Sequence, residues 1–212
     1  MPDTDHPHNL KDLTEPDNQS SAEIRKIKRA QRNAFPTSTQ QEHSEALEQL
    51  IIQNKAYKNS QHIACYLAND GEIDPVKIIG HAWSDNKTIY LPILSPSKNS
   101  LYFVAYTNES KFKKNRFGIP EPICQPSQWK KASQMDLLLI PLVAFDVSGN
   151  RIGMGGGFYD RTLAFLPQLQ QWEKPGLIGL AHEIQKVNHL NRQEWDIPLD
   201  VIITEKKIYK PG

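Results

Sequence analysis

A cluster of glycines flanked by charged residues is the strongest chemical signal in the sequence. Residues 153–157 contain four glycines, Arg151 precedes them, and Asp160 and Arg161 follow. Glycine lets backbone N–H groups approach an anion closely, and a helix that begins after the loop adds positive potential. A basic residue in such a loop favours phosphate, and a neighbouring carboxylate suggests a metal ion bridging to that phosphate.

Two standard phosphate motifs are absent from this segment. The dinucleotide-binding fingerprint needs a further glycine where this chain has Phe158. No Gly-Lys-Ser or Gly-Lys-Thr follows the glycines, so the segment is not a Walker loop. Glycine-rich turns also form for geometric reasons alone, because glycine permits positive φ, and it is the flanking charges that favour anion binding here.

The elements around this loop predict an α/β fold. A short apolar run at 135–140 predicts a buried central strand before the glycines, and residues 159–171 have helical spacing after them. The alternation of apolar runs with helical patterns indicates a single open, largely parallel sheet flanked by helices in three Rossmann-like layers. Further strands are expected at 62–67, 88–94, 101–106, 177–181 and 201–204, and further helices at 21–34, at 40–55 and from Asp74-Pro75 onward.

Three loops of this predicted sheet could meet at one edge. In open α/β sheets, ligands bind outside the carboxyl ends of the strands. Glu72, residues 111–122 and residues 149–161 all follow predicted strands, and residues 111–131 form a long irregular connection. Connections of this length are more often functional than idle, so we expect the three segments to converge on a ligand.

The first predicted helix carries a row of basic residues. Ser20 and Glu23 have the spacing of a capping box, which predicts a helix start. Helical spacing puts the arginines on one face and lets the helix bury two isoleucines on another; these are Arg25, Arg29 and Arg32, and Ile24 and Ile27. A solvated helix face is the alternative explanation of the basic row.

The composition is that of a globular chain without a polyanionic partner. The chain has 212 residues, of which 38% are hydrophobic, and its net charge of +1 gives no indication of a nucleic acid partner. Residues 1–20 are almost free of large apolar side chains and are predicted to be a disordered tail before a single α/β catalytic domain at 21–212. The sequence has no secretory signal and no apolar stretch of about 18–20 residues, which predicts a cytoplasmic protein without a membrane partner.

The glycine-rich segment and several shorter segments resemble one enzyme family. Pro141 through Arg161 is similar to the signature of the 5-formyltetrahydrofolate cyclo-ligase family, also called the 5,10-methenyltetrahydrofolate synthetase family. Shorter similarities occur in the same order along the chain, at 66–74, 91–93, 118–122, 194–198 and 202–204. Their order over roughly residues 21–205 is more specific than any one of them.

The resemblance implies a defined reaction. The family cyclises 5-formyltetrahydrofolate to 5,10-methenyltetrahydrofolate with ATP and Mg²⁺ and releases ADP and phosphate. The γ-phosphoryl group is transferred to the formyl oxygen, and N10 of the folate attacks the activated carbon. The expected partners are therefore the two small-molecule substrates, and a monomer is expected, with a homodimer as the alternative.

The resemblance also implies roles for particular residues. The residues implied to bind ATP are Arg25, Arg151, Ile152, Gly153, Met154, Gly155, Gly156, Gly157, Phe158 and Tyr159. Those implied to bind the folate are Leu67, Glu72, Phe117, Met154, Gly155, Gly156, Gly157 and Phe158. Arg151 and Asp160 are implied to be catalytic, and Asp160 and Asp196 to bind Mg²⁺.

Each of these roles has a simpler alternative. Asp160 could be a helix-start aspartate favoured by the dipole, and Asp196 a loop residue before Ile197-Pro198. Glu72 could be an exposed loop acid, Leu67 part of a strand core and Phe117 a loop anchor. Two departures from the family pattern bear on ATP binding. Ser21 stands where the family usually has lysine, and residues 154–156 lack the basic residues that some members carry.

Two other function classes are compatible with such a fold. A non-catalytic folate-binding protein would be expected to lose Arg151, Asp160 or several glycines, and this chain keeps them all. Another phosphotransferase would have no reason to match Glu72 and residues 116–122. The sequence therefore favours the ATP-dependent ligase.

Overall fold

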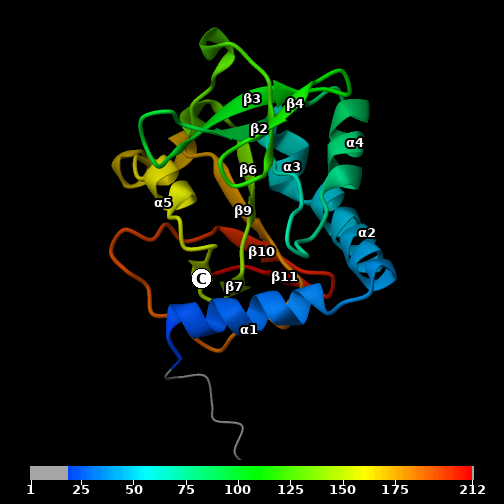
Figure 1. Cartoon of the computed structure of the whole chain (residues 1–212), viewed down its shortest axis with the longest axis vertical. Helices are drawn as coiled ribbons and strands as arrows, with labels where there is room; N and C mark the ends of the chain where they lie inside the picture. The colour runs from blue at the N-terminus through cyan, green and yellow to red at the C-terminus, as the bar shows by residue number, and fades with distance from the viewer. Residues whose placement is uncertain (1–18, 212) are drawn as a thin grey trace, which may run out of the picture.

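A seven-stranded sheet with the order β11-β10-β9-β6-β1-β2-β3 organises the chain (Figure 1). The computed structural model describes residues 19–211, so residues 1–18 of the predicted tail, and Gly212, lie outside the described part. The strands are β1 His62–Ala64, β2 Thr88–Leu94, β3 Leu101–Tyr106, β6 Leu137–Pro141, β9 Gly176–Leu180, β10 Val201–Ile203 and β11 Ile208–Tyr209. Strands β10, β9, β6, β1 and β2 pair in parallel, and the two edge strands are antiparallel. The predicted largely parallel α/β sheet is confirmed.

Alternate residues of the central strand face two separate cores. Leu137 and Leu139 belong to a cluster with the apolar faces of three helices, α2 Thr37–Gln53, α3 Lys55–Asn59 and α4 Val76–Ser84. Leu138 and Ile140 belong to the opposite cluster, which includes residues of α5 Phe158–Leu163 and of the loops around it. Burying each such side chain contributes roughly 1.5–3 kcal/mol. The sheet is therefore the middle of three layers, as the alternating pattern predicted.

Short 3-10 helices connect several of these elements. They are η2 Pro126–Gln128, η3 Ala132–Gln134, η4 Leu166–Gln168, η5 Gln171–Glu173 and η6 Glu183–Gln185. None of the helices among residues 19–211 is both long and apolar enough to cross a membrane.

The first helix, α1 Ser21–Asn33, begins as predicted but faces the molecule differently. The Glu23 N–H donates to Ser20 Oγ at 3.3 Å, and the Ser20 N–H donates to Glu23 Oε2 at 2.8 Å, so the capping box is present. The predicted basic stripe is wrong in part, because Arg32 is fully buried and Ile27 is 39% exposed. Arg32 can be buried because its guanidinium donates hydrogen bonds to the carbonyls of Asp70 and Leu142, which lie opposite the helix.

The chain reverses its direction across the sheet between β1 and β6. It passes from β1 to β2 and β3 on one side and then returns to β6 on the other side of β1. Loops that leave the carboxyl ends of β1 and β6 therefore diverge from the same point, which is where open α/β sheets bind ligands. Residues 65–75 and 142–157 are those loops.

The surroundings of the glycines differ from the predicted strand, loop and helix. A small hairpin, β7 Ala144–Phe145 with β8 Arg151–Ile152, stands between β6 and the glycines. Asp146 forms its turn, since Oδ1 accepts the N–H groups of Ser148 and Asn150 at 3.0 and 3.1 Å. The predicted helix at 159–171 is also wrong in length, because α5 ends at Leu163. Pro167 has no N–H to continue it.

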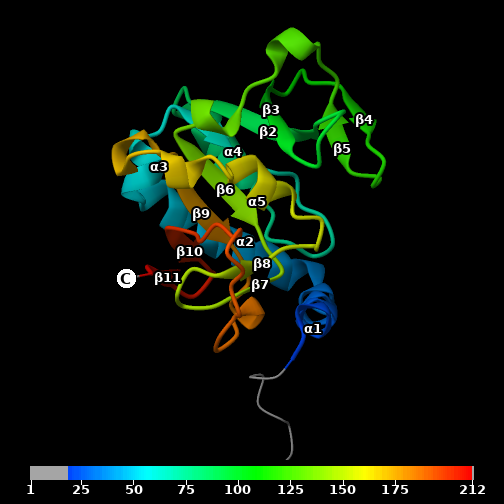
Figure 2. The same ribbon diagram turned by 90° about the vertical axis from the view of Figure 1, so that its left-hand side faces the viewer.

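The region predicted to be irregular contains a second hairpin. Strands β4 Phe112–Lys114 and β5 Pro120–Pro122 pair antiparallel and project beyond β2 and β3 (Figure 2). The hairpin follows β3, whose end lies at the opposite edge of the sheet, so it does not follow a carboxyl edge directly. It returns to that edge because Glu121 Oε1 accepts the Leu94 N–H at 2.9 Å.

Candidate active site

The glycine-rich loop, residues 153–157, is an exposed turn bordered by arginines from two elements. Gly155 and Gly157 have φ values of +94° and +60°, a region that side chains other than glycine rarely adopt. From α1, Arg25 Nε donates to the Gly153 carbonyl at 2.8 Å. A methyl group on Gly155 would lie 3.6 Å from Arg25 Cζ, so the guanidinium lies directly over the turn. The structure thus brings Arg25 together with the loop, and both are among the residues implied to bind ATP.

Arg161 approaches the same loop from α5. Its Nη2 donates to the Gly156 carbonyl, and its Nε donates to the Asn99 carbonyl at 2.6 Å. The guanidinium also lies 5.7 Å from the centre of the Phe158 ring. Arg161 was absent from the predicted binding residues, although it directly follows Asp160 in the signature. The two guanidinium groups give the loop the positive charge that an anion requires.

Arg151 and Asp160 form an ion pair beneath the loop. Arg151 Nη2 lies 2.6 Å from Asp160 Oδ1, and Arg151 Nη1 donates to the Ile197 carbonyl. The Ile197 N–H is 3.5 Å from the same Asp160 oxygen. Only 5% of the Arg151 side chain is exposed, so its guanidinium contacts Asp160 and the Ile197 carbonyl rather than solvent.

The two aspartates suggested as magnesium ligands are both connected to Ile197. Asp196 directly precedes Ile197, and its Oδ2 accepts the Gln193 N–H at 2.9 Å. The hydrogen bonds of Asp160 involve Oδ1, and those of the Asp196 carboxylate involve Oδ2. One oxygen of each carboxylate is left for another ligand. This donor set fits Mg²⁺, which usually takes one or two carboxylates together with phosphate and water.

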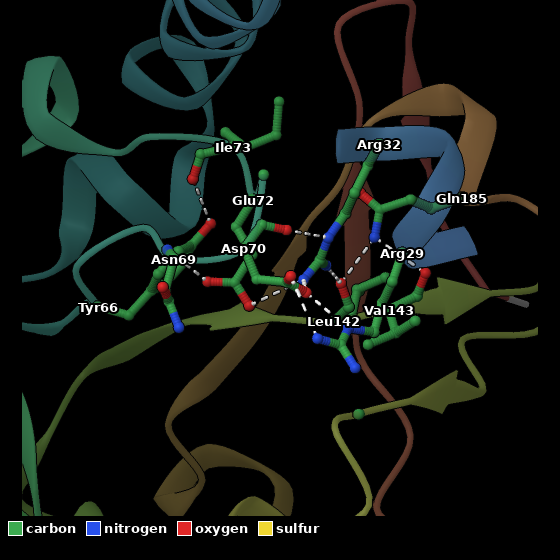
Figure 3. Close-up of polar contacts among 12 residues, drawn as sticks. Arg29, Arg32, Tyr66, Asn69, Asp70, Glu72, Ile73, Leu142, Val143 and Gln185 are labelled. Atoms are coloured by element: carbon green, nitrogen blue, oxygen red, sulfur yellow. Dashed lines mark hydrogen bonds and ion pairs between the residues drawn. The ribbon is translucent and has the colours of Figure 1, made fainter. Parts of the chain in front are cut away.

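A second loop, residues 69–73, holds Glu72 and is fastened to α1 (Figure 3). Arg32 is the centre of this contact. Its Nε donates to the Asp70 carbonyl at 2.7 Å, its Nη2 to Asp70 Oδ2 at 2.9 Å and its Nη1 to the Leu142 carbonyl at 3.0 Å. One buried side chain therefore ties the loop after β1 to the segment after β6.

Further donors from the same helix complete the Glu72 loop. Asp70 has a φ of 54° and accepts hydrogen bonds from Arg29 Nε at 2.7 Å and Asn33 Nδ2 at 3.0 Å. The Arg29 hydrogen bond is the main reason that the pKa of Asp70 falls to about 2, and Asn33 and Arg32 lower it further. Asp70 is therefore ionised in the folded protein at neutral pH.

Glu72 is a mostly buried carboxyl group with few hydrogen bonds. Its Oε2 accepts the Asn69 N–H at 3.2 Å, and its Oε1 lies 3.7 Å from Arg32 Nη2. Its side chain is 13% exposed, so it is not the exposed loop acid of the simpler alternative. Burial raises the pKa of Glu72 to about 7, although Arg32 acts in the opposite direction. Close to neutral pH this group can exist in either charge state.

The remaining predicted residues lie around the two loops. Leu67 is partly exposed in the segment after β1, which ends at Ala64, so it is outside the strand. Phe117, at the tip of the β4–β5 hairpin, is 56% exposed and meets Phe158 edge to face, with ring centres 5.8 Å apart. Tyr159 packs instead against the core, and burial raises the pKa of its hydroxyl group.

Comparison with known proteins finds relatives along almost the whole chain. The sequence model of the 5-formyltetrahydrofolate cyclo-ligase family matches residues 17–205. A 5-formyltetrahydrofolate cyclo-ligase from Haemophilus influenzae is 40% identical over 190 residues, which are 87% of this chain and 96% of the relative. One from Escherichia coli is 37% identical over 185 residues, or 86% of this chain and 98% of the relative.

A solved structure agrees with these sequence relationships. The solution structure of a 5,10-methenyltetrahydrofolate synthetase from Aquifex aeolicus superposes with a TM-score of 0.74 at 28% identity. The similarity covers 90% of this chain and 92% of that one.

Proposed function

The chain belongs to the 5-formyltetrahydrofolate cyclo-ligase family, and we propose that it converts 5-formyltetrahydrofolate to 5,10-methenyltetrahydrofolate with ATP. The observation that supports this most strongly is the meeting of two unlike loops at the β1–β6 reversal. The glycine-rich loop has the exposed backbone and the arginines that suit phosphates. The Glu72 loop has a buried carboxyl group that suits a polar heterocycle. Helix α1 contacts both loops through Arg25 and Arg32.

The reaction needs activation of a poor electrophile. A formamide carbonyl resists attack, and its oxygen is a poor leaving group. Transfer of the γ-phosphoryl group to that oxygen breaks the bond to ADP and makes the oxygen part of a phosphate leaving group. The N10 lone pair then attacks the formyl carbon, and loss of phosphate and the N10 proton closes the five-membered ring. The enzyme's main tasks are to align two substrates and to stabilise charge on the phosphoryl group.

The residues of the glycine-rich loop would bind the nucleotide. Backbone N–H groups of the exposed turn and the guanidinium groups of Arg25 and Arg161 would hold the phosphate oxygens. Both arginines donate to loop carbonyls in this structure, and we expect them to turn toward the phosphates when ATP binds. Arg151 would hold the Asp160 carboxylate in its orientation beside them.

Asp160 and Asp196 would hold the magnesium ion through their remaining oxygens. Bound there, Mg²⁺ would supply positive charge that stabilises the transferring phosphoryl group. Glu72 would contact the folate, and Leu67 and Phe117 would offer apolar surface to its rings. Phe117 is exposed on a projecting hairpin, so it is available to stack on an aromatic group.

The activity is tested by the absorbance of the methenyl product. Purified protein with 5-formyltetrahydrofolate should generate that absorbance only when both ATP and Mg²⁺ are added, and ADP should form in equal amount. Omission of Mg²⁺, or excess EDTA, should abolish the signal. Binding of both substrates without product would instead identify a non-catalytic folate-binding protein. ADP formation without methenyl product would identify a different phosphotransferase.

A further inference from the structure

Two histidines and a glutamate lie together behind the Glu72 loop, and the mechanism proposed above uses none of the three. His43 is on α2, His182 follows β9 and Glu205 follows β10. One donor atom from each residue lies within 4.8 Å of the other two. His43 Nδ1 and His182 Nδ1 are 2.9 Å apart, and the ring of Phe35 packs against both imidazoles at 5.1 and 5.3 Å. His182 is fully buried, which fixes its position.

The hydrogen bonds fix which nitrogen of His182 carries the proton. His182 Nε2 lies 3.1 Å from the Gly71 carbonyl, and a carbonyl can only accept. Nε2 therefore holds the hydrogen, and Nδ1 of the neutral ring presents a lone pair to His43. The two Nδ1 atoms share a single hydrogen, which His43 supplies. On the other side of that ring, His43 Nε2 is 3.9 Å from Glu205 Oε1.

We propose that His43, His182 and Glu205 form a binding site for one divalent transition-metal ion, for which Zn²⁺ is the natural probe. The ion would bind Nδ1 of His182, one ring nitrogen of His43 and one Glu205 oxygen, with water in the open position. The neutral His43 ring keeps its single hydrogen on the nitrogen that does not bind the ion. Two imidazoles with one carboxylate are a common zinc ligand set, and they suit Mg²⁺ poorly.

The surroundings of the three side chains already orient them for this role. A histidine that binds a metal usually donates its other N–H to a carbonyl or carboxylate, as His182 does to Gly71. The Glu205 carboxylate is held in place because Oε2 accepts the Glu183 N–H at 2.8 Å. The positive charge of Arg32, which acts on His182, is already paired with Asp70.

Zinc binding can be measured on the full chain without an affinity tag, after treatment with EDTA. Competition with a chromophoric chelator should give one Zn²⁺ per chain, and the ion should raise Tm while the same concentration of Mg²⁺ does not. His43→Gln should weaken the affinity for Zn²⁺ by about tenfold or more, because it removes one metal ligand. The His43 side chain is partly exposed, so the substitution should disturb the fold little. Co²⁺ should give visible absorption bands that the same substitution removes. The inference does not depend on the proposed catalytic activity.

Histidines elsewhere in the chain provide the controls. His189→Gln changes an exposed imidazole outside the cluster, and the double variant His6→Gln/His8→Gln removes the two histidines of the N-terminal segment. Both should retain the zinc affinity of the natural sequence. The proposal is wrong if His43→Gln keeps that affinity, if the double variant loses it, or if the natural sequence binds no zinc. A His182→Asn variant adds a second test where it folds.

Discussion

The glycine-rich loop and the Glu72 loop leave neighbouring strands at the same edge, yet they are built in opposite ways. The first is exposed, and its backbone carbonyls are held by Arg25 and Arg161. The second is enclosed, and the buried guanidinium of Arg32 fixes its carbonyl and its aspartate together. Both depend on arginines from the surface helices, but only the second buries the arginine.

This difference indicates which loop adjusts to its ligand. In the glycine-rich loop, the two arginines donate hydrogen bonds to loop carbonyls and can exchange them for hydrogen bonds to a ligand. The N–H groups of the turn are then the groups that would bind phosphate. In the Glu72 loop, Arg32, Arg29 and Asn33 satisfy Asp70 before any ligand arrives. We therefore expect the nucleotide side to reorganise on binding and the folate side to be largely preformed.

The largest effect should come from removing Arg32. Arg32→Ala removes a fully buried side chain together with its hydrogen bonds to Asp70 and to the Leu142 carbonyl, and large-to-small changes at buried positions typically cost about 2–5 kcal/mol. The matched control is Arg29→Ala, whose side chain is 45% exposed and binds the same aspartate, and which should cost about 0–1 kcal/mol. Urea unfolding of both variants measures the difference. Similar losses in the two variants would show that the Glu72 loop is not held from inside.

The next effect tests the ion pair beneath the glycine-rich loop. Asp160→Asn keeps the shape of the side chain but removes the charge implied to hold the metal. Turnover at saturating ATP and Mg²⁺ should fall by about 10²–10³, the usual cost of losing one group that stabilises transition-state charge. Tm should change little, because the amide oxygen still accepts from Arg151. Near-normal turnover would exclude Asp160 from the reaction and leave it a structural partner of Arg151.

A smaller and more selective effect should separate the two loops by ligand. Arg25→Ala should weaken nucleotide binding by about tenfold and leave folate binding unchanged, because Arg25 contacts only the glycine-rich loop. Glu72→Gln should do the reverse. Calorimetric titration of each variant with each substrate measures the contrast. Equal losses for both ligands would mean that the loops do not divide the work.

The last effect is a pH dependence of stability that arises from Glu72. Its pKa is about 7 in the folded protein and near 4.5 when unfolded, so the folded state holds the proton more tightly. Its contribution is complete below the lower value and is lost as pH rises through about 7, at about 1.4 kcal/mol per pH unit for one proton. Glu72→Gln should remove this loss. Urea unfolding between about pH 5 and 7 measures it.

Comparison of the two proteins is needed because another group titrates nearby. Burial lowers the pKa of His182 to about 4 from the usual 6.5. Between these values the unfolded state binds the proton more tightly, so the contribution of His182 to stability increases as pH rises, opposite to that of Glu72. Asp70 stays ionised across this range because Arg29 holds its pKa at about 2, and burial raises the pKa values of the phenols of Tyr66 and Tyr159. The difference between the natural sequence and Glu72→Gln isolates the carboxyl group. If the free energy of unfolding depends on pH in the same way in both proteins, Glu72 is ionised across the whole measured range.

Much of the fold could be predicted because its signals are local. Strands β2 and β3 have the predicted bounds, since each is an apolar run between turn residues. The start of α1 was predicted from its capping box. The hairpin β7–β8 was missed because two strands of two residues carry no periodicity. The length of α5 was wrong because the apolar spacing continues into residues that follow Pro167 in a 3-10 turn.

The site was harder to predict because its contacts are distant in sequence. Spacing could put Arg25, Arg29 and Arg32 on one face, but it could not show that Arg32 is buried. That burial depends on the carbonyls of Asp70 and Leu142, which only the folded sheet brings to the helix. The spacing of residues likewise could not show that Arg151 pairs with Asp160. The glycines themselves were found because their types and positions are a local requirement.

The position of α1 also has a consequence for the order in which the protein is made. Arg25 bonds to a carbonyl 128 residues further along the chain, and Arg32 to one 110 residues away. The helix is synthesised before the sheet, yet these two carbonyls, of Gly153 and Leu142, follow only after more than half of the 212 residues. Contacts of such separation close late and slow folding, because the intervening chain must be ordered first. During synthesis helix α1 therefore cannot form these two contacts until the later residues have been made, and the loops that depend on them do not reach their final form before then.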